Sequence, residues 1–104
     1  MNSSVVVSKL VESIEVQSNS IVSKQIIKKT NGNITLFGFD KGETLSEHTS
    51  PYDAFVYIVE GKMEIRIGGI SHIVEAGDQL VMPANIPHGL MAIEKVKMLL
   101  CMIK

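Results

Sequence analysis

The sequence predicts an all-β protein with a single domain, and three observations lead to this prediction. Apolar and polar residues alternate along most of the chain, as they do in strands with one buried face. Glycine and proline interrupt the alternation at short intervals, where strands are expected to turn. The length of 104 residues suffices for one hydrophobic core but not for two. Seven or eight short strands of this kind are typical of a sandwich or a barrel.

The N-terminal segment is the least regular part of the chain. Val6, Leu10 and Ile14 recur at helical spacing, so residues 5–16 form the one plausible helix, although three consecutive valines disfavour it. Residues 19–23 and 31–33 are expected to be connectors. We therefore assign residues 1–33 to an N-terminal arm with the first strand or strands, and residues 34–104 to the barrel of the same domain.

Most of the remaining chain is predicted to form short strands. Met63, Ile65 and Ile67 alternate with charged residues, and two glycines end that strand. The residues before it are β-branched and aromatic, and the intervening Glu-Gly pair predicts a hairpin. The other predicted strands cover residues 34–42, 54–62, 70–78, 79–83, 89–93 and 96–104.

The composition excludes several classes of protein. Lys and Arg total 10 and Asp and Glu total 11, and these charges are scattered, which argues against nucleic-acid binding. No apolar run approaches the roughly 20 residues that span a bilayer, so we expect no membrane interaction. The N-terminus lacks the features of a secretory signal, so a cytoplasmic location is expected. Cys101 lies within an apolar run and is expected to be a core residue.

Glycines and histidines recur with a defined spacing in residues 42–92. The first run places glycine, histidine, serine, alanine and glycine at Gly42, His48, Ser50, Ala54 and Gly61. The second run comprises Gly77, Pro83, Asn85, His88 and Ala92. The two runs resemble the two motifs of the cupins. In the first motif, Ser50 stands where a cupin has a second histidine, and Ala54 stands where it has a glutamate. In the second motif, Asn85 stands where a cupin has glycine, and Ala92 stands where it has asparagine.

The resemblance implies a cupin-type jelly-roll β-barrel, also called a double-stranded β-helix, with His48 pointing inward. Strand alternation then predicts the other inward residues. These are Ser50, Ala54, Val56, Ile58, Met63, Ile65, Ile67, Leu80, Met82, His88, Leu90, Val96, Met98, Leu100 and Met102. Lys95 and Lys97 are expected to face water. Phe55, Tyr57 and Val59 are expected to face outward, and we predict that a second subunit covers them in a homodimer.

The resemblance also implies a metal site, because three histidines and a glutamate bind one divalent metal in the family. Of these four ligands only His48 and His88 have counterparts here, and two imidazoles fall short of the three protein ligands of a catalytic site. A weakly bound Zn, Ni or Fe ion would therefore need Asp53 or His72 as an extra ligand. The interpretation we favour is that Asp53 caps a turn and that His72 is a hydrogen-bonded residue on a strand.

Two classes of function remain open. The first is a module that binds a small-molecule ligand in an apolar pocket, with His48, Ser50, Tyr52, Met82 and His88 as contact residues. The second is a cupin enzyme of the isomerase or oxygenase type, metal-dependent or metal-poor, acting on a small metabolite. The inward set contains no nucleophile-base pair and no carboxylate dyad, which favours the binding module. A sensory domain is a third possibility, and it would act through a partner because no helix-turn-helix is predicted.

Overall fold

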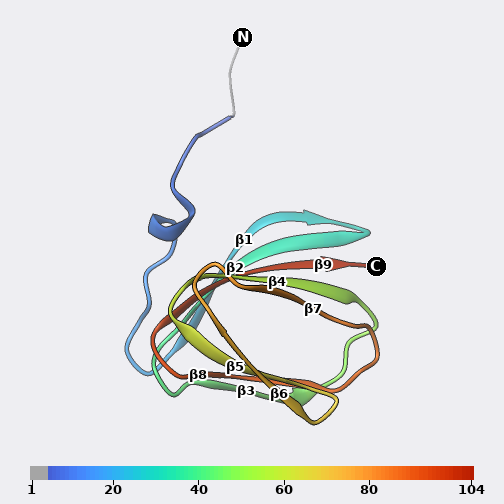
Figure 1. Cartoon of the computed structure of the whole chain (residues 1–104). Coiled ribbons are helices and arrows are strands. Elements are labelled where there is room, and N and C mark those ends of the chain that lie inside the picture. Colours follow the sequence, from blue (N-terminus) through green and yellow to red (C-terminus); the bar gives the residue numbers. More distant parts are fainter. Residues whose placement is uncertain (1–4) are drawn as a thin grey trace.

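The chain folds as a barrel of two antiparallel sheets that face each other (Figure 1). The structure is a computed structural model that describes residues 5–104. One sheet has the strand order β1-β2-β9-β4-β7 and the other has the order β3-β8-β5-β6. The prediction of an all-β, single-domain jelly-roll barrel is therefore confirmed.

Nine strands of the described part of the chain form the two sheets. The five-stranded sheet contains β1 (Ile21–Lys29), β2 (Gly32–Phe39), β9 (Val96–Ile103), β4 (Asp53–Glu60) and β7 (Gln79–Met82). The four-stranded sheet contains β3 (Thr44–His48), β8 (His88–Ala92), β5 (Lys62–Ile67) and β6 (Ile70–Glu75). Strand β1 lies within residues 1–33, where a first strand was expected without bounds, because its sequence is largely polar and exposed. Strand β3 was not predicted, because it is short.

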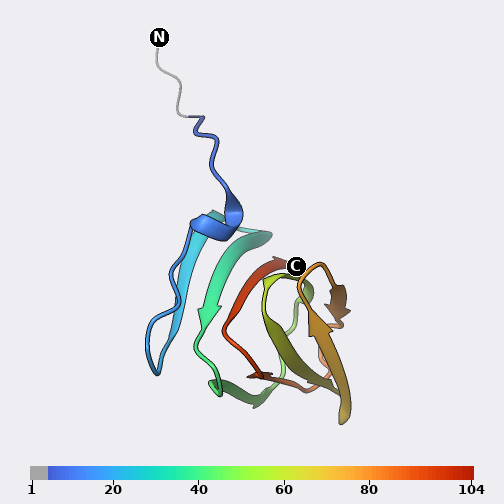
Figure 2. The same cartoon turned by 60° about the vertical axis from the view of Figure 1, so that its left-hand side comes forward.

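The first described residues extend away from the barrel, as Figure 2 shows, and Val5, Val6 and Val7 are exposed. The helix predicted over residues 5–16 is reduced to one 3₁₀ turn, η1 (Leu10–Glu12). The predicted connector at residues 19–23 is also wrong in part, because β1 begins at Ile21 and pairs with β2 along its whole length. Among residues 5–104, no helix is long and apolar enough to cross a membrane.

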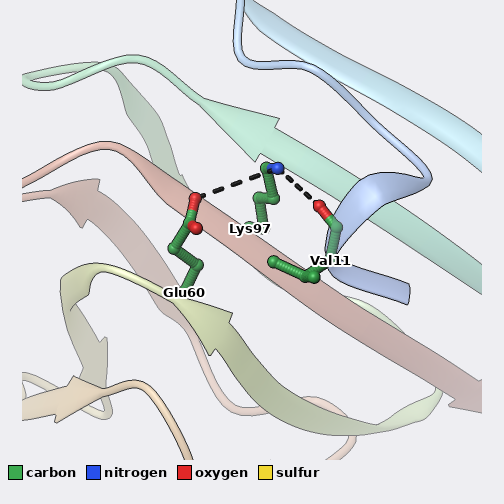
Figure 3. A network of polar contacts seen from close by, with 3 residues as sticks. All are labelled: Val11, Glu60 and Lys97. Carbon is green, nitrogen blue, oxygen red and sulfur yellow. Dashed lines mark hydrogen bonds and ion pairs between the residues drawn. The ribbon is translucent and has the colours of Figure 1, made fainter. Parts of the chain in front are cut away.

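The outer face of the five-stranded sheet is partly covered by the N-terminal segment. Lys97, which was expected to face water, is only 15% exposed in its side chain. Its ammonium group donates a hydrogen bond to the carbonyl oxygen of Val11 and lies 3.9 Å from Oε2 of Glu60 (Figure 3). Leu36 lies on the same face and is fully buried. The N-terminal segment thus contacts the outer face at Lys97, while the predicted cover of Phe55, Tyr57 and Val59 by a second subunit stays a prediction.

The core lies between the inner faces of the two sheets. Its buried members are Phe39, Ala54, Val56, Ile58, Met63, Ile65, Val74, Met82, Leu90, Ala92, Val96 and Met98. Most of these residues belong to the predicted inward set, so the alternation of apolar and polar residues assigned the strand faces correctly. Each buried aliphatic side chain stabilises the fold by roughly 1.5–3 kcal/mol relative to its exposed state.

The chain changes sheet at Gly61, and the hairpin predicted there is wrong. Strand β4 pairs with β7 and β9, whereas β5 pairs with β6 and β8. Gly61 has φ +93°, and a Cβ atom at this position would lie 2.9 Å from the carbonyl carbon of Lys95. The true hairpin joins β5 to β6 through Gly68 and Gly69, whose φ angles of +57° and +82° suit a type I′ turn.

Candidate functional site

Two histidines lie side by side on the inner face of the four-stranded sheet. His48 ends β3 and His88 begins β8, and the two residues are cross-strand partners. Their ring centroids are 4.4 Å apart, with an angle of 67° between the ring planes. The structure therefore brings together the two residues that correspond to histidines of the cupin motifs.

A β-bulge in β3 turns His48 toward the interior. Leu45 pairs with Leu90, and the next paired residues are His48 and His88. Two residues of β3 thus lie between these pairs, opposite the single residue of β8, Gly89. In a regular strand, residues 45 and 48 would face opposite sides of the sheet. The extra residue reverses this parity, so both side chains face the interior.

Backbone carbonyl groups fix the tautomer of each imidazole ring. Nδ1 of His48 lies 2.7 Å from the carbonyl oxygen of Ser46, and Nδ1 of His88 lies 3.3 Å from that of Ile86. Because a carbonyl oxygen can only accept a hydrogen bond, Nδ1 is the donor in both rings. The lone pair of each neutral ring is then on Nε2. Neither Nε2 atom has a hydrogen-bond partner among the described residues.

His88 is held in its neutral form at pH 7. The residue is only 6% exposed, and this burial lowers the pKa of its imidazole below the ordinary value of 6.5. The hydrogen bond to the Ile86 carbonyl opposes this lowering of the pKa, and electrostatic repulsion between the two imidazoles adds to it. Nε2 of His88 is therefore a hydrogen-bond acceptor or a base at neutral pH.

Both histidines border an interior cavity of about 150 Å³. Its walls are almost entirely apolar, and the polar side chains among its lining residues are the two histidines and Ser50. The remaining lining residues are Phe37, Leu45, Ala54, Met82, Leu90, Met98, Leu100 and Met102. Four of the five predicted contact residues, His48, Ser50, Met82 and His88, thus line one cavity; their role in binding stays a prediction.

Sequence reasoning missed two residues that line the cavity. Leu45 was missed because the bulge breaks the alternation between this residue and His48. Phe37 was missed because its neighbour Leu36 is equally apolar, so the sequence does not show which of the two faces inward. The register with β9 would have identified Phe37, since its partner is Met98, which was correctly placed inside.

The other residues that the sequence singled out lie outside this cavity. Tyr52 lines a separate hollow, where the ammonium group of Lys104 lies 5.5 Å from the centroid of its ring. Oδ1 of Asp53 accepts a hydrogen bond of 2.9 Å from the backbone N–H of Ala84, which lies 31 residues away, and a local turn cap by Asp53 stays a prediction. His72 is exposed on the edge strand β6.

The residues of the cavity do not fit the divalent metal that the cupin motifs imply. Within residues 5–104, no group of three or more His, Cys, Asp or Glu side chains is arranged to hold a metal ion. The pair supplies two imidazole nitrogens, and Ala54 stands in the cavity wall where the motif has a glutamate. Neither Asp53 nor His72 lines the cavity. Two nitrogen ligands without a third protein ligand give a weak site.

Comparison with known proteins identifies relatives of the barrel. Residues 35–103 match the model of a family described as "Cupin domain". A protein named polyketide synthase CurC from Streptomyces cyaneus is 31% identical over 70 residues, which cover 66% of this chain and 46% of that protein. Protein SchB from Streptomyces halstedii is 35% identical over 48 residues, covering 45% of this chain and 35% of that protein. The chain thus spans less than half the length of the curated relatives it matches.

Solved structures resemble the whole barrel. A conserved protein of unknown function from Streptococcus pyogenes has a TM-score of 0.91 and 35% identity, covering 100% of this chain and 90% of its own. A cupin 2 conserved barrel domain protein from Leptotrichia buccalis has a TM-score of 0.87 and 40% identity, with coverages of 90% and 46%. An RmlC-like cupin from Desulfovibrio desulfuricans, at 24% identity and a TM-score of 0.82, covers 95% of this chain and 96% of its own and shares the fold alone.

Proposed function

The chain belongs to the cupin domain family, and we propose that its barrel binds a small, mostly apolar molecule that carries a hydroxyl group. A fold of this kind serves many functions, so the argument must come from the site itself. The observation that carries the proposal is the pair of imidazoles with open Nε2 atoms at an apolar cavity.

The chemistry of the ligand follows from the walls and from the two acceptors. Apolar walls favour an apolar body, because its transfer from water is favourable. An apolar ligand that displaces water from Nε2 of the buried His88 without replacing the hydrogen bond makes binding less favourable, because a buried polar atom is then left unpaired. A hydroxyl group on the ligand would donate that hydrogen bond.

The size of the ligand follows from the cavity volume. An engineered apolar cavity of about 150 Å³ accommodates benzene, and the volume here is about the same. Pockets for drug-sized ligands are larger, roughly 300–1,000 Å³. Phenol therefore combines the expected size, the apolar body and the hydroxyl donor, and it is a suitable first probe.

The test is an NMR titration with phenol and with anisole, in which a methyl group replaces the donated proton. We expect phenol to bind more tightly than anisole to the unmodified protein. In the variant that removes the accepting Nε2, His48→Leu or His88→Leu, the preference should shrink by about 2- to 13-fold, since one hydrogen bond contributes roughly 0.5–1.5 kcal/mol. His72→Leu is the matched control, because this histidine is exposed and does not line the cavity. No saturable binding, or a preference that is unchanged in both His48→Leu and His88→Leu, would contradict the proposal.

A second candidate function, a metal-poor cupin enzyme acting on a small metabolite, is supported by the depressed pKa of His88. A neutral imidazole in an apolar wall can take a proton from a bound substrate. The printed name of one relative, a polyketide synthase, also refers to an enzyme, although that protein is more than twice as long as the matched region. Deuterium exchange next to the carbonyl group of cyclohexanone should then exceed the buffer rate and be lost in His88→Leu. Exchange at the buffer rate would argue for binding alone.

A further inference from the structure

A second hollow lies beside the histidine cavity and is lined by positive charge. It has a volume of about 300 Å³ and lies where the β1–β2 turn, the start of β4 and the end of β9 meet. Three of its lining residues are lysines, namely Lys28, Lys29 and Lys104. Tyr52 and Met102 also line it, and no carboxylate side chain does.

One row of cross-strand partners connects the two hollows. Lys28 pairs with Asn33, Asn33 with Met102, Met102 with Ala54, and Ala54 with Met82. Side chains of directly opposed residues lie on the same face of a sheet. The row begins at Met82 and Ala54 in the histidine cavity and ends at Asn33 and Lys28 in the lysine-lined hollow. Met102 lines both, so the two hollows are neighbours along the inner face.

The loop between β3 and β4 contributes one residue to each of the two hollows. Ser50 lines the histidine cavity and Tyr52 lines the lysine-lined hollow. The backbone N–H of Tyr52 donates a hydrogen bond of 3.2 Å to Oγ of Ser50, which fixes the two residues relative to each other. A ligand held at Ser50 and the histidines would therefore lie close to the lysine-lined hollow.

The three lysines of the hollow have no acidic partner in the described part of the chain. The ion pair that forms within residues 5–104 is between Lys97 and Glu60, on the outer face. Asp53, the neighbour of Tyr52 in sequence, accepts a hydrogen bond from Ala84 and does not line the hollow. Lys28 faces the inner side with Met102, whereas strand alternation directs the side chain of its neighbour Lys29 to the opposite face. Lys28 and Lys104 are therefore the two cations at this hollow, and two like charges around one concave surface create a positive potential that attracts anions. This excess of positive charge is confined to the hollow, because the chain as a whole carries a net charge of −1.

We infer that the natural ligand is a small hydroxylated carboxylate, with its apolar body in the histidine cavity and its carboxylate directed toward Lys28. This inference rests on the proposed function and extends it. Adjacent strands are about 4.8 Å apart, so the backbone of Lys28 lies roughly 10 Å from that of Met102, two strands away. The four-carbon stem of the lysine covers much of this distance. A short linker between the apolar body of the ligand and its carboxylate is therefore long enough for the carboxylate to reach Lys28.

The test compares phenol with three acids that carry zero, one or two methylene groups between ring and carboxylate. These are 4-hydroxybenzoate, 4-hydroxyphenylacetate and 3-(4-hydroxyphenyl)propionate. We expect one of them to bind about two- to fivefold more tightly than phenol at low ionic strength, as partly exposed ion pairs usually allow. The gain should be lost in Lys28→Gln and should fall at 0.5 M salt, whereas the affinity for phenol should change little.

Lys41→Gln is the matched control, since it removes the same charge beyond the other end of β2, roughly 25 Å away at about 3.3 Å per residue. Should phenol bind while none of the acids gains affinity, or should Lys28→Gln keep the gain, the inference is overturned and the proposed function stands. Failure of phenol and of all three acids to bind would overturn both. Circular dichroism of each variant separates loss of binding from loss of folding.

Discussion

Replacing Gly61 with alanine should destabilise the barrel far more than the same replacement at Gly77. Both glycines have φ +93°, so the backbone cost of a side chain is the same at the two positions. At Gly77 an added Cβ would meet no atom within 4 Å. At Gly61 it would collide with the carbonyl oxygen of Lys95, and it would also lie 2.9 Å from the carbonyl carbon. Both obstacles are backbone atoms that cannot rotate away.

The magnitudes follow from this comparison. A left-handed conformation costs a non-glycine residue roughly 1–2 kcal/mol, which is the expected loss for Gly77→Ala. For Gly61→Ala we expect about 4 kcal/mol or more, the range of changes that disrupt a tightly packed backbone. Urea unfolding followed by circular dichroism measures both losses. Losses that agree within about 0.5 kcal/mol would refute the reasoning, because they would show that the close approach of the Lys95 carbonyl is absent in solution.

Three further predictions concern the histidine pair. Because burial lowers the pKa of His88 in the folded protein, the unfolded state binds more protons as pH falls below about 6.5, so stability should decrease there. Urea titrations at pH 5.5 and 7.5 measure this decrease in the free energy of unfolding. Compared with the unmodified protein, the decrease should be smaller in His88→Leu and the same in His72→Leu. Zinc should bind weakly, and dialysis against a chelator should leave the unfolding temperature unchanged; binding that survives chelator would contradict the two-ligand site. Deleting Glu47 should make β3 a regular strand in which Ser46 alone lies opposite Gly89, so His48 should stay paired with His88 and the NMR cross-peak between the two imidazole rings should persist; loss of that cross-peak would contradict the register assigned to β3.

Local alternation was sufficient to predict most of the interior. In β5 and β9 one face of each strand is regularly apolar, and Met63, Ile65 and Met98 are buried as expected. Lys97 was misplaced because its environment depends on a segment more than eighty residues earlier in the chain, whose carbonyl group at Val11 binds the ammonium. Alternation describes a strand and its own sheet, and it contains no information about what packs on the outer face.

The candidate site shows the same division between local and long-range information. The spacing of the glycines and histidines was enough to place His48 and His88 together, because each has a fixed position in a motif. The bulge that orients His48 was not predictable, since it depends on how many residues of β3 lie opposite Gly89. The change of sheet at Gly61 was mistaken for a hairpin because a glycine with positive φ is compatible with both.

A crystal structure of the protein with phenol would test the central claim most directly. The account predicts the phenol ring in the cavity bordered by Leu90 and Met98, with its oxygen about 2.7–3.0 Å from Nε2 of His48 or His88. Phenol bound elsewhere, or bound in the cavity with its hydroxyl group directed away from both imidazoles, would contradict the claim that the histidine pair recognises a hydroxyl donor.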